Sequence, residues 1–326
     1  MPNSALIHEQ TSGVYIISIT PFSEDGSIDF KSVDSLVEFF LEKGVTGITI
    51  LGMMGEANKL SANESRGFVK HFLKRVNGRV PVMAGVSDAG LANLVNLSRF
   101  SMDAGCAGVM VAPLIGLNTD QKLYDYYAQV IEYLGANVPL CYQDYPQSTG
   151  VHLSVECFNR MVNDFPQLVM LKHEDCPGLE KLTQVRYSAE KQGLRRVSVL
   201  TGNGGLYLPQ ELQRGADGAM TGFAYPEMLT AVVTLHADGE TKHAEDLYDA
   251  YLPLVRYEQQ PGYGLAVRKE VLRRRGAVTC ALSRAPGPVL SRRGHEELDH
   301  LTARLDSRLK ELERRSQKND PENEQV

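Results

Sequence analysis

The sequence predicts an α/β fold, a (β/α)8 TIM barrel followed by a helical C-terminal appendage. The first observation is an alternation of short β-branched runs with amphipathic helical stretches, which is typical of parallel strands joined by helical crossovers. The second is that the runs are apolar almost throughout, as expected for strands buried on both faces. The third is their number, because eight strand–helix units favour a closed barrel over an open sheet.

Eight runs are expected to form the strands of this barrel. They are VYIISIT (14–20), GITIL (47–51), VPVMAGV (80–86), GVMVAP (108–113), VPLCYQ (138–143), LVMLK (168–172), VSVLTG (197–202) and GAMTG (218–222). Helical periodicity is clearest at 29–44, 61–78 and 118–135. Ser61 and Glu64 have the spacing of a capping box, which predicts that the second of these helices begins there.

The pattern changes after residue 236, where helical stretches follow one another without a strand between them. We therefore divide the chain into a barrel (1–236), a helical appendage (237–316) and a polar tail (317–326) that is expected to be disordered. A basic helix at 267–276 would attract anions, but we interpret it as a solvated face offset by the acidic residues of 245–251.

Composition excludes several classes of protein. The 326 residues carry a formal net charge of −6, with 43% hydrophobic and 23% charged residues, which is a soluble globular balance without the basic footprint of a nucleic-acid-binding protein. No apolar run is long enough to span a membrane, and the N-terminus does not resemble a signal peptide. Five cysteines without a CxxC pair indicate reduced thiols in a cytoplasmic protein, and no His, Asp or Glu spacing indicates a metal or cofactor site.

The chemistry is expected where the strands of the barrel end, because active sites of this fold lie at that face. Lys172 ends the sixth predicted strand and Gln143 the fifth. Strand alternation places Lys172 and Met170 inside the barrel and turns Val169 and Leu171 towards the helices. A lysine buried there loses hydration of its charged form, which favours the neutral amine and its attack on a carbonyl to give a Schiff base.

A simpler interpretation is that Lys172 lies at the rim and pairs with Glu174 or Asp175. The barrel pattern alone favours this interpretation slightly, because rim lysines are common. Further motifs change the balance. GVYIISITPFSEDGSIDF, GVTGITILGMMGEANKLSANE, LVMLKHED, TGNGG and RGADGAMTG occur in that order along the chain.

With these segments the chain resembles the dihydrodipicolinate synthase / N-acetylneuraminate lyase family of class I aldolases, over about residues 13–290. The resemblance implies that Lys172 forms the Schiff base with a 2-oxo acid such as pyruvate. It implies no cofactor, a 2-oxo acid and an aldehyde as small-molecule partners, and a homotetramer or dimer. The substrate-binding positions it implies are Met53, Met54, Gly55, Glu56, Gly202, Asn203 and Met220.

The chain departs from the family pattern at the end of the fifth strand, where members usually carry a tyrosine that relays protons. Aligning Pro146 without gaps puts Gln143 in that place. Tyr142 comes one residue early and is expected to face the helices, and Tyr145 comes two residues late in the loop. Three residues thus compete for this position, and we favour Gln143, because a shift by one residue would turn the whole strand over.

Further departures argue against dihydrodipicolinate synthesis. Met53 and Met54 stand where the family commonly has hydroxyl residues, although backbone N–H groups of that loop still suit a carboxylate. Leu114 and Ile115 replace tyrosines of the synthases, and Ser148 replaces an arginine. These changes favour a more apolar pocket and a less polar aldehyde.

Glu174 is expected to share the inward face with Lys172 and to act as general acid and base in place of the tyrosine. A purely structural ion pair at the rim is about as well supported. Glu56 is interpreted either as a site residue or as a carboxylate that only fixes its loop, while Asp144 and His173 are expected to face outward.

The leading hypothesis is therefore a lyase that uses Lys172, Gln143 and Glu174 for aldol cleavage, aldol condensation or dehydration. A second hypothesis is a non-catalytic or regulatory protein that binds keto acids and has lost the tyrosine relay. A third is a barrel enzyme that works without a Schiff base and uses Glu174 as its base.

Overall fold

The eight parallel strands form one closed barrel. A computed structural model describes residues 5–318, and in it the strands pair in sequence order until β8 closes onto β1. The strands are β1 Gly13–Ile17, β2 Gly47–Ile50, β3 Val82–Gly85, β4 Gly108–Val111, β5 Leu140–Asp144, β6 Leu168–His173, β7 Ser198–Thr201 and β8 Gly218–Ala219. The predicted fold class is confirmed, and every strand lies within or next to its predicted run.

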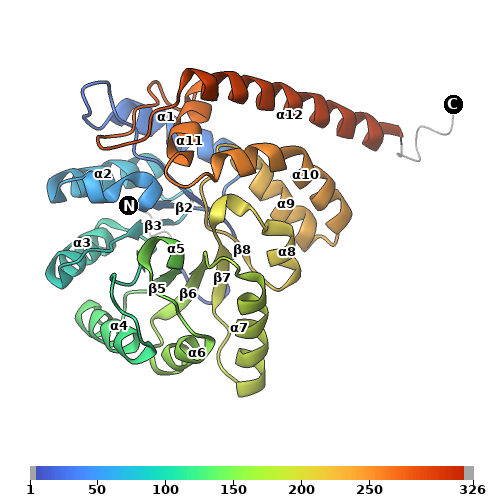
Figure 1. Cartoon of the computed structure of the whole chain (residues 1–326). Coiled ribbons are helices and arrows are strands. Elements are labelled where there is room, and N and C mark those ends of the chain that lie inside the picture. Colours follow the sequence, from blue (N-terminus) through green and yellow to red (C-terminus); the bar gives the residue numbers. More distant parts are fainter. Residues whose placement is uncertain (1–4, 319–326) are drawn as a thin grey trace.

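Helices cover the outside of the barrel and continue beyond it (Figure 1). They are α1 Phe30–Glu42, α2 Ala62–Val76, α3 Leu91–Ala104, α4 Asp120–Leu134, α5 Pro146–Thr149, α6 Val155–Asp164, α7 Leu179–Gln192, α8 Leu208–Gln213, α9 Pro226–Ala237, α10 Thr241–Glu258, α11 Gly264–Arg274 and α12 Arg292–Lys318. Short 3-10 turns follow β2 and β7: η1 Met53–Gly55, η2 Ala57–Lys59 and η3 Asn203–Gly205. The predicted capping box is present at the start of α2, where Ser61 and Glu64 each accept the other's backbone N–H.

Strand alternation separates the core into two layers. Outward-facing strand residues pack with the helices, and inward-facing residues fill the barrel with a smaller apolar cluster. The inner cluster includes Met83, Met110, Cys141, Met170 and Met220. This cluster is the apolar floor on which any group at the strand ends rests.

One strand position was predicted wrongly. Val169 belongs to the inner cluster and not to the helix-facing layer, whereas Leu171 faces the helices as expected. The reason is a register shift between β5 and β6: Leu140 pairs with Leu168 but Cys141 pairs with Met170, so Val169 is an extra residue. The shift ends before Lys172, which keeps its inward direction.

The C-terminal helices form a continuous layer against one side of the barrel. Helix α10 packs on α9, α11 and α12, and the long α12 runs along the edge of the molecule (Figure 1). Residues 317 and 318 of the expected tail belong to α12, and 319–326 lie outside the described residues.

The prediction of a solvated basic helix at 267–276 was wrong for its first half. Arg268 and Lys269 of α11 are buried and make ion pairs with buried glutamates rather than with water. Val267 and Val271 form an apolar face of α11. Arg268 and Lys269 are buried beside them, and a buried charge needs a charged partner.

Candidate active site

Lys172 and Glu174 form a buried pair where β6 ends. Their Nζ and Oε2 atoms lie 2.9 Å apart, and the two side chains are only 6% and 10% exposed. The Gln143 side chain donates from Nε2 to the same Oε2 atom at 2.8 Å. The Lys172 amine and the Gln143 amide thus both contact the same carboxylate oxygen of Glu174.

The strand register explains this meeting. Gln143 of β5 pairs with Lys172 of β6, so the two side chains leave neighbouring strands at the same level and on the same inward face. Glu174 extends the ladder by donating its N–H to the carbonyl of Asp144, and so its side chain also points inward. Gly202 after β7 leaves the necessary room, because a Cβ there would lie 2.2 Å from Cγ of Glu174.

The three residues that compete for the family's tyrosine position are now separated. Gln143 lies beside Lys172, while Tyr142 is buried in the outer layer and stacks on Tyr127 at 4.6 Å between ring centroids. Tyr145 is half-buried at the start of α5. Burial raises the pKa of Tyr145, the Glu174 carboxylate raises it further, and Arg268 opposes them. Tyr145 therefore lies within electrostatic reach of Glu174 but is not its hydrogen-bond partner.

The loop after β2 brings backbone rather than side-chain donors to the site. Met54 packs on the inner cluster, and Met53 is 43% exposed and accepts a hydrogen bond from Ser148 at 3.3 Å. Their N–H groups begin the turn η1 and have no acceptor within residues 5–318. The Gly55 carbonyl is held by the Thr20 hydroxyl at 2.6 Å, which fixes the turn.

Glu56 points away from Lys172. Its Oε1 accepts from Lys269 at 2.5 Å, and its Oε2 accepts from Lys59 at 2.8 Å and from the Arg284 N–H at 2.9 Å. Among the two interpretations of this carboxylate, the geometry favours the one in which it fixes its loop.

Of the other residues proposed for substrate binding, Asn203 and Met220 also lie at the strand ends, after β7 and β8. Asn203 donates to the Glu174 carbonyl at 3.1 Å, and Met220 is fully buried in the inner cluster. Next to them, burial raises the pKa of the Cys141 thiol to about 12, although Lys172 favours the thiolate. Cys141 is therefore a protonated part of the floor below the lysine.

The outer face of the same two strands carries a second buried polar cluster. Asp144 and His173 face outward as expected, and the Asp144 carboxylate binds Lys181 at 2.7 Å and lies 3.5 Å from Nδ1 of His173. Burial disfavours the charged form of His173, but Asp144 outweighs it and the pKa of His173 is raised. Burial also raises the pKa of Glu211, which lies in the same layer, to about 7.

Sequence reasoning missed one charged group at the strand ends. Arg268 of α11 is 4% exposed and pairs through Nε with Glu258, the last residue of α10. Its Nη1 atom lies 2.5 Å from the position that a Cβ on Gly222 would take. The available signal was a glycine, Gly222, at an inward-facing position after β8.

This arrangement is suited to carbonyl chemistry. An amine with an adjacent carboxylate attacks a ketone, and the carboxylate moves the protons. No group of three or more His, Cys, Asp or Glu side chains in residues 5–318 is placed to hold a metal ion, and no helix in that range is long and apolar enough to cross a bilayer.

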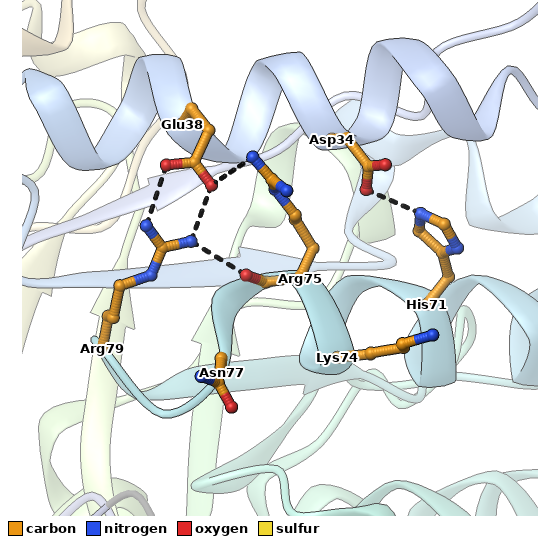
Figure 2. A pocket seen from close by; sticks show the side chains of 7 residues that line it. All are labelled: Asp34, Glu38, His71, Lys74, Arg75, Asn77 and Arg79. Atoms are coloured by element: carbon orange, nitrogen blue, oxygen red, sulfur yellow. Dashed lines mark hydrogen bonds and ion pairs between the residues drawn. The ribbon is translucent and has the colours of Figure 1, made fainter.

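A separate hollow between α1 and α2 lies at the other end of the barrel (Figure 2). Asn77 and Arg79 line this hollow just before β3 begins, whereas Lys172 lies where strands end. Glu38 is held by Arg75 at 2.8 Å and Arg79 at 2.7 Å, and Asp34 lies 2.8 Å from His71. Both carboxylates are thus taken up in joining the two helices.

Comparison with known proteins identifies the family of this chain. The model of the dihydrodipicolinate synthetase family matches residues 10–304. A 4-hydroxy-tetrahydrodipicolinate synthase of Persephonella marina is 28% identical over 249 residues, which are 75% of this chain and 81% of the relative. An L-2-keto-3-deoxyarabonate dehydratase of Azospirillum brasilense is 27% identical over 298 residues, which are 90% and 94% of the two chains.

Solved structures extend the similarity. The crystal structure of a dihydrodipicolinate synthase from Rhodopseudomonas palustris has a TM-score of 0.90 and 45% identity, and the match covers 92% of this chain and all of the other. The pyruvate complex of YagE, a prophage protein of Escherichia coli K12, has a TM-score of 0.82 at 22% identity and covers 90% and 98% of the two chains, which supports the fold alone. This chain belongs to the dihydrodipicolinate synthetase family of class I Schiff-base lyases.

Proposed function

We propose that the protein is a lyase in which Lys172 forms a Schiff base with a 2-oxo acid and Glu174 carries the protons. The observation that carries this proposal is the 2.9 Å contact between Lys172 Nζ and Glu174 Oε2, with both side chains nearly buried. Gln143 orients the carboxylate by donating to the same oxygen. The free N–H groups of Met53 and Met54 suit the carboxylate of the 2-oxo acid.

Each proton in the condensation has a place to go. Glu174 takes a proton from the Lys172 ammonium, and the resulting amine forms a C–N bond with C2 of the keto acid. The carbonyl oxygen takes a proton from the attacking nitrogen and becomes a hydroxyl, then receives the proton held by Glu174 and leaves as water, which completes the iminium. Glu174, again a carboxylate, then removes a proton from C3 and gives the enamine.

Among the reactions open to this enamine we favour loss of water from C4 of a hydroxylated 2-oxo acid. Protonated Glu174 can return its proton to the departing C4 oxygen, so that one carboxyl group serves both steps. Met53, Met54 and Ser148 lack the side chains that the resemblance leads us to expect in a dihydrodipicolinate synthase.

The test is a steady-state assay with 2-oxo-3-deoxypentonate, 2-oxo-3-deoxyhexonate and pyruvate plus an aldehyde. We expect consumption of a 2-oxo-3-deoxy acid without pyruvate release. Release of pyruvate would replace dehydration by aldol cleavage but keep the Schiff base. Turnover that persists in Lys172→Arg, which keeps the charge but forms no imine, would contradict the Schiff base itself.

The assay also separates the enzyme from a protein that only binds keto acids. Pyruvate would bind to such a protein and raise its midpoint of thermal unfolding, yet the protein would turn over none of the three substrates.

A further inference from the structure

We propose that Arg268 is a specificity-determining residue that binds the hydroxyl oxygens of the substrate chain beyond C3, so that the natural substrate is a monocarboxylic 2-oxo-3-deoxy sugar acid. This proposal rests on the proposed function and adds to it a residue that comes from the C-terminal appendage rather than from the barrel.

The position of the guanidinium group carries the proposal. Arg268 lies against Gly222, with Nη1 at 2.5 Å and Cζ at 3.1 Å from the place of a Cβ. Met220 belongs to the inner cluster, and alternation returns Gly222 to the same inward side two residues later. The end of the Arg268 side chain therefore occupies inward-facing space after β8, just as Glu174 occupies the space that Gly202 leaves after β7.

The hydrogen-bonding state of Arg268 indicates a missing partner. Its side chain is only 4% exposed, and its one bond to a described residue runs from Nε to Glu258. Neither Nη nitrogen has an acceptor in residues 5–318, and neither is fully enclosed by protein atoms. These N–H groups therefore remain open to a further acceptor, which is water in the free protein and which a bound substrate can replace with its own oxygens.

Electrostatics connects Arg268 with the reacting pair. The pKa of Tyr145 responds to both Glu174 and Arg268, which act in opposite directions. Tyr145 follows β5, Glu174 follows β6, and Arg268 lies over the end of β8. The two charges thus both lie within electrostatic reach of the same tyrosine.

Charge balance selects the chemical class of the group that Arg268 binds. Glu258 already neutralises Arg268, and Glu174 neutralises Lys172. A second carboxylate would bring another negative charge into a site with no spare cation among these residues. Arg268 therefore offers directed N–H groups rather than net charge, and these suit hydroxyl oxygens.

Two variants test this proposal. Arg268→Lys keeps a cation beside Glu258 but removes the Nη groups. Gly222→Ala keeps Arg268 and displaces its end. For both we expect the KM for 2-oxo-3-deoxypentonate to rise roughly 10- to 100-fold, the range for a hydrogen bond to a charged group, with a smaller change in kcat. Half-saturation of borohydride trapping by pyruvate, which has no chain beyond C3, should stay within about twofold.

Arg275→Lys is the matched control, because Arg275 also pairs with a glutamate, Glu227, but its guanidinium donates to the Ala224 carbonyl and joins the end of α11 to α9. This variant should behave as wild type with both compounds. Parallel changes for pyruvate and the sugar acid in Arg268→Lys and Gly222→Ala would indicate a structural role and overturn the proposal, as would no change in either. A higher kcat/KM of wild type for 2-oxo-3-deoxyhexarate, a dicarboxylate, would overturn the assignment to hydroxyl groups.

The failure of the underlying function is distinguishable. If wild type is not trapped with pyruvate or any sugar acid, the Schiff base is wrong and this proposal falls with it. If wild type and both variants are trapped with pyruvate but have the same KM for 2-oxo-3-deoxypentonate, only the role of Arg268 is wrong.

Discussion

Two buried lysine–glutamate pairs lie within residues 5–318, and they differ in how fully the ammonium group is satisfied. Lys269 is 1% exposed and has three acceptors: Glu56 at 2.5 Å, the Thr20 carbonyl at 3.0 Å and the Leu282 carbonyl at 2.7 Å. Lys172 is 6% exposed and has one partner in the described part of the chain, Glu174 at 2.9 Å.

Lysine thus serves two different purposes in this protein. An ammonium carries three donors, and Lys269 uses all of them to tie the loop after β2 to α11 and to residue 282. It also lies 4.6 Å from the Phe22 ring centroid, which further holds the charge in place. Lys172 leaves two donors unused, and the carboxylate beside it is a ready proton acceptor. The first lysine is an anchor, and the second is free to react.

The largest expected effect separates the two lysines by activity. Lys172→Met should lower kcat/KM by at least about a thousandfold, because no other amine replaces the nucleophile. Its free energy of unfolding should fall by less than that of Lys269→Met, since Glu174 keeps the Gln143 donor and some access to solvent. Turnover and urea unfolding of the purified variant check both parts, and substantial residual turnover would remove the distinction between the pairs.

The second expected effect is a loss of stability without a loss of the nucleophile. Lys269→Met should reduce the free energy of unfolding by about 3 to 5 kcal/mol, because it leaves Glu56 and two carbonyl groups buried with too few donors. Urea denaturation measures this loss. The fraction that remains folded should still be trapped by pyruvate and borohydride at Lys172. A Lys269→Met protein as stable as wild type would show that Lys269 is no anchor.

The third effect sharpens the role of the carboxylate. Glu174→Gln should lower kcat by about 100- to 1000-fold, within the range for a general acid–base group, because an amide moves no protons. Schiff-base formation with pyruvate should persist at a reduced rate, since Lys172 is unchanged. Single-turnover trapping and steady-state assays separate these steps. Normal kcat in Glu174→Gln would assign the proton transfer to another group, with Tyr145 the nearest candidate.

The smallest effect concerns the cluster on the outer face of β5 and β6. Glu211 has a pKa raised from 4.5 to about 7 in the folded protein, so folding favours its protonated form. Its contribution to stability is present below pH 4.5 and is lost as the pH rises to about 7, and a raised pKa of His173 acts in the same direction.

Glu211→Gln should remove much of this dependence, on the order of 2 to 3 kcal/mol between pH 4.5 and pH 8. Urea midpoints at pH 5 and pH 8 for wild type and variant measure it. If the two proteins lose stability in parallel over this interval, the pH dependence has another origin.

Most of the fold could be predicted from periodicity, because barrel strands are apolar on both faces and each is followed by a helix. All eight strands were located, as was the capping box at Ser61. Val169 could not be placed correctly, because the register shift at Leu140 depends on how β5 and β6 pair and leaves no mark in either run.

The site was predictable only where strand direction decides it. Alternation along β5 and β6 correctly separates inward Gln143 from outward Tyr142 and brings Lys172 to the strand ends. Arg268 was not predictable in this way, because α11 lies far along the chain and its polarity suggests exposure. The oligomeric state, the cytoplasmic location and the use of an aldehyde remain predictions from the sequence.

The most direct test of the difference between the two lysines is peptide mapping after borohydride reduction with pyruvate. One stable adduct is expected, on Lys172, and none on Lys269. The Lys172→Met protein, folded as judged by urea unfolding, should give no adduct at all. An adduct on Lys269, or an unmodified wild-type protein at saturating pyruvate, would contradict the claim that the singly paired lysine is the nucleophile.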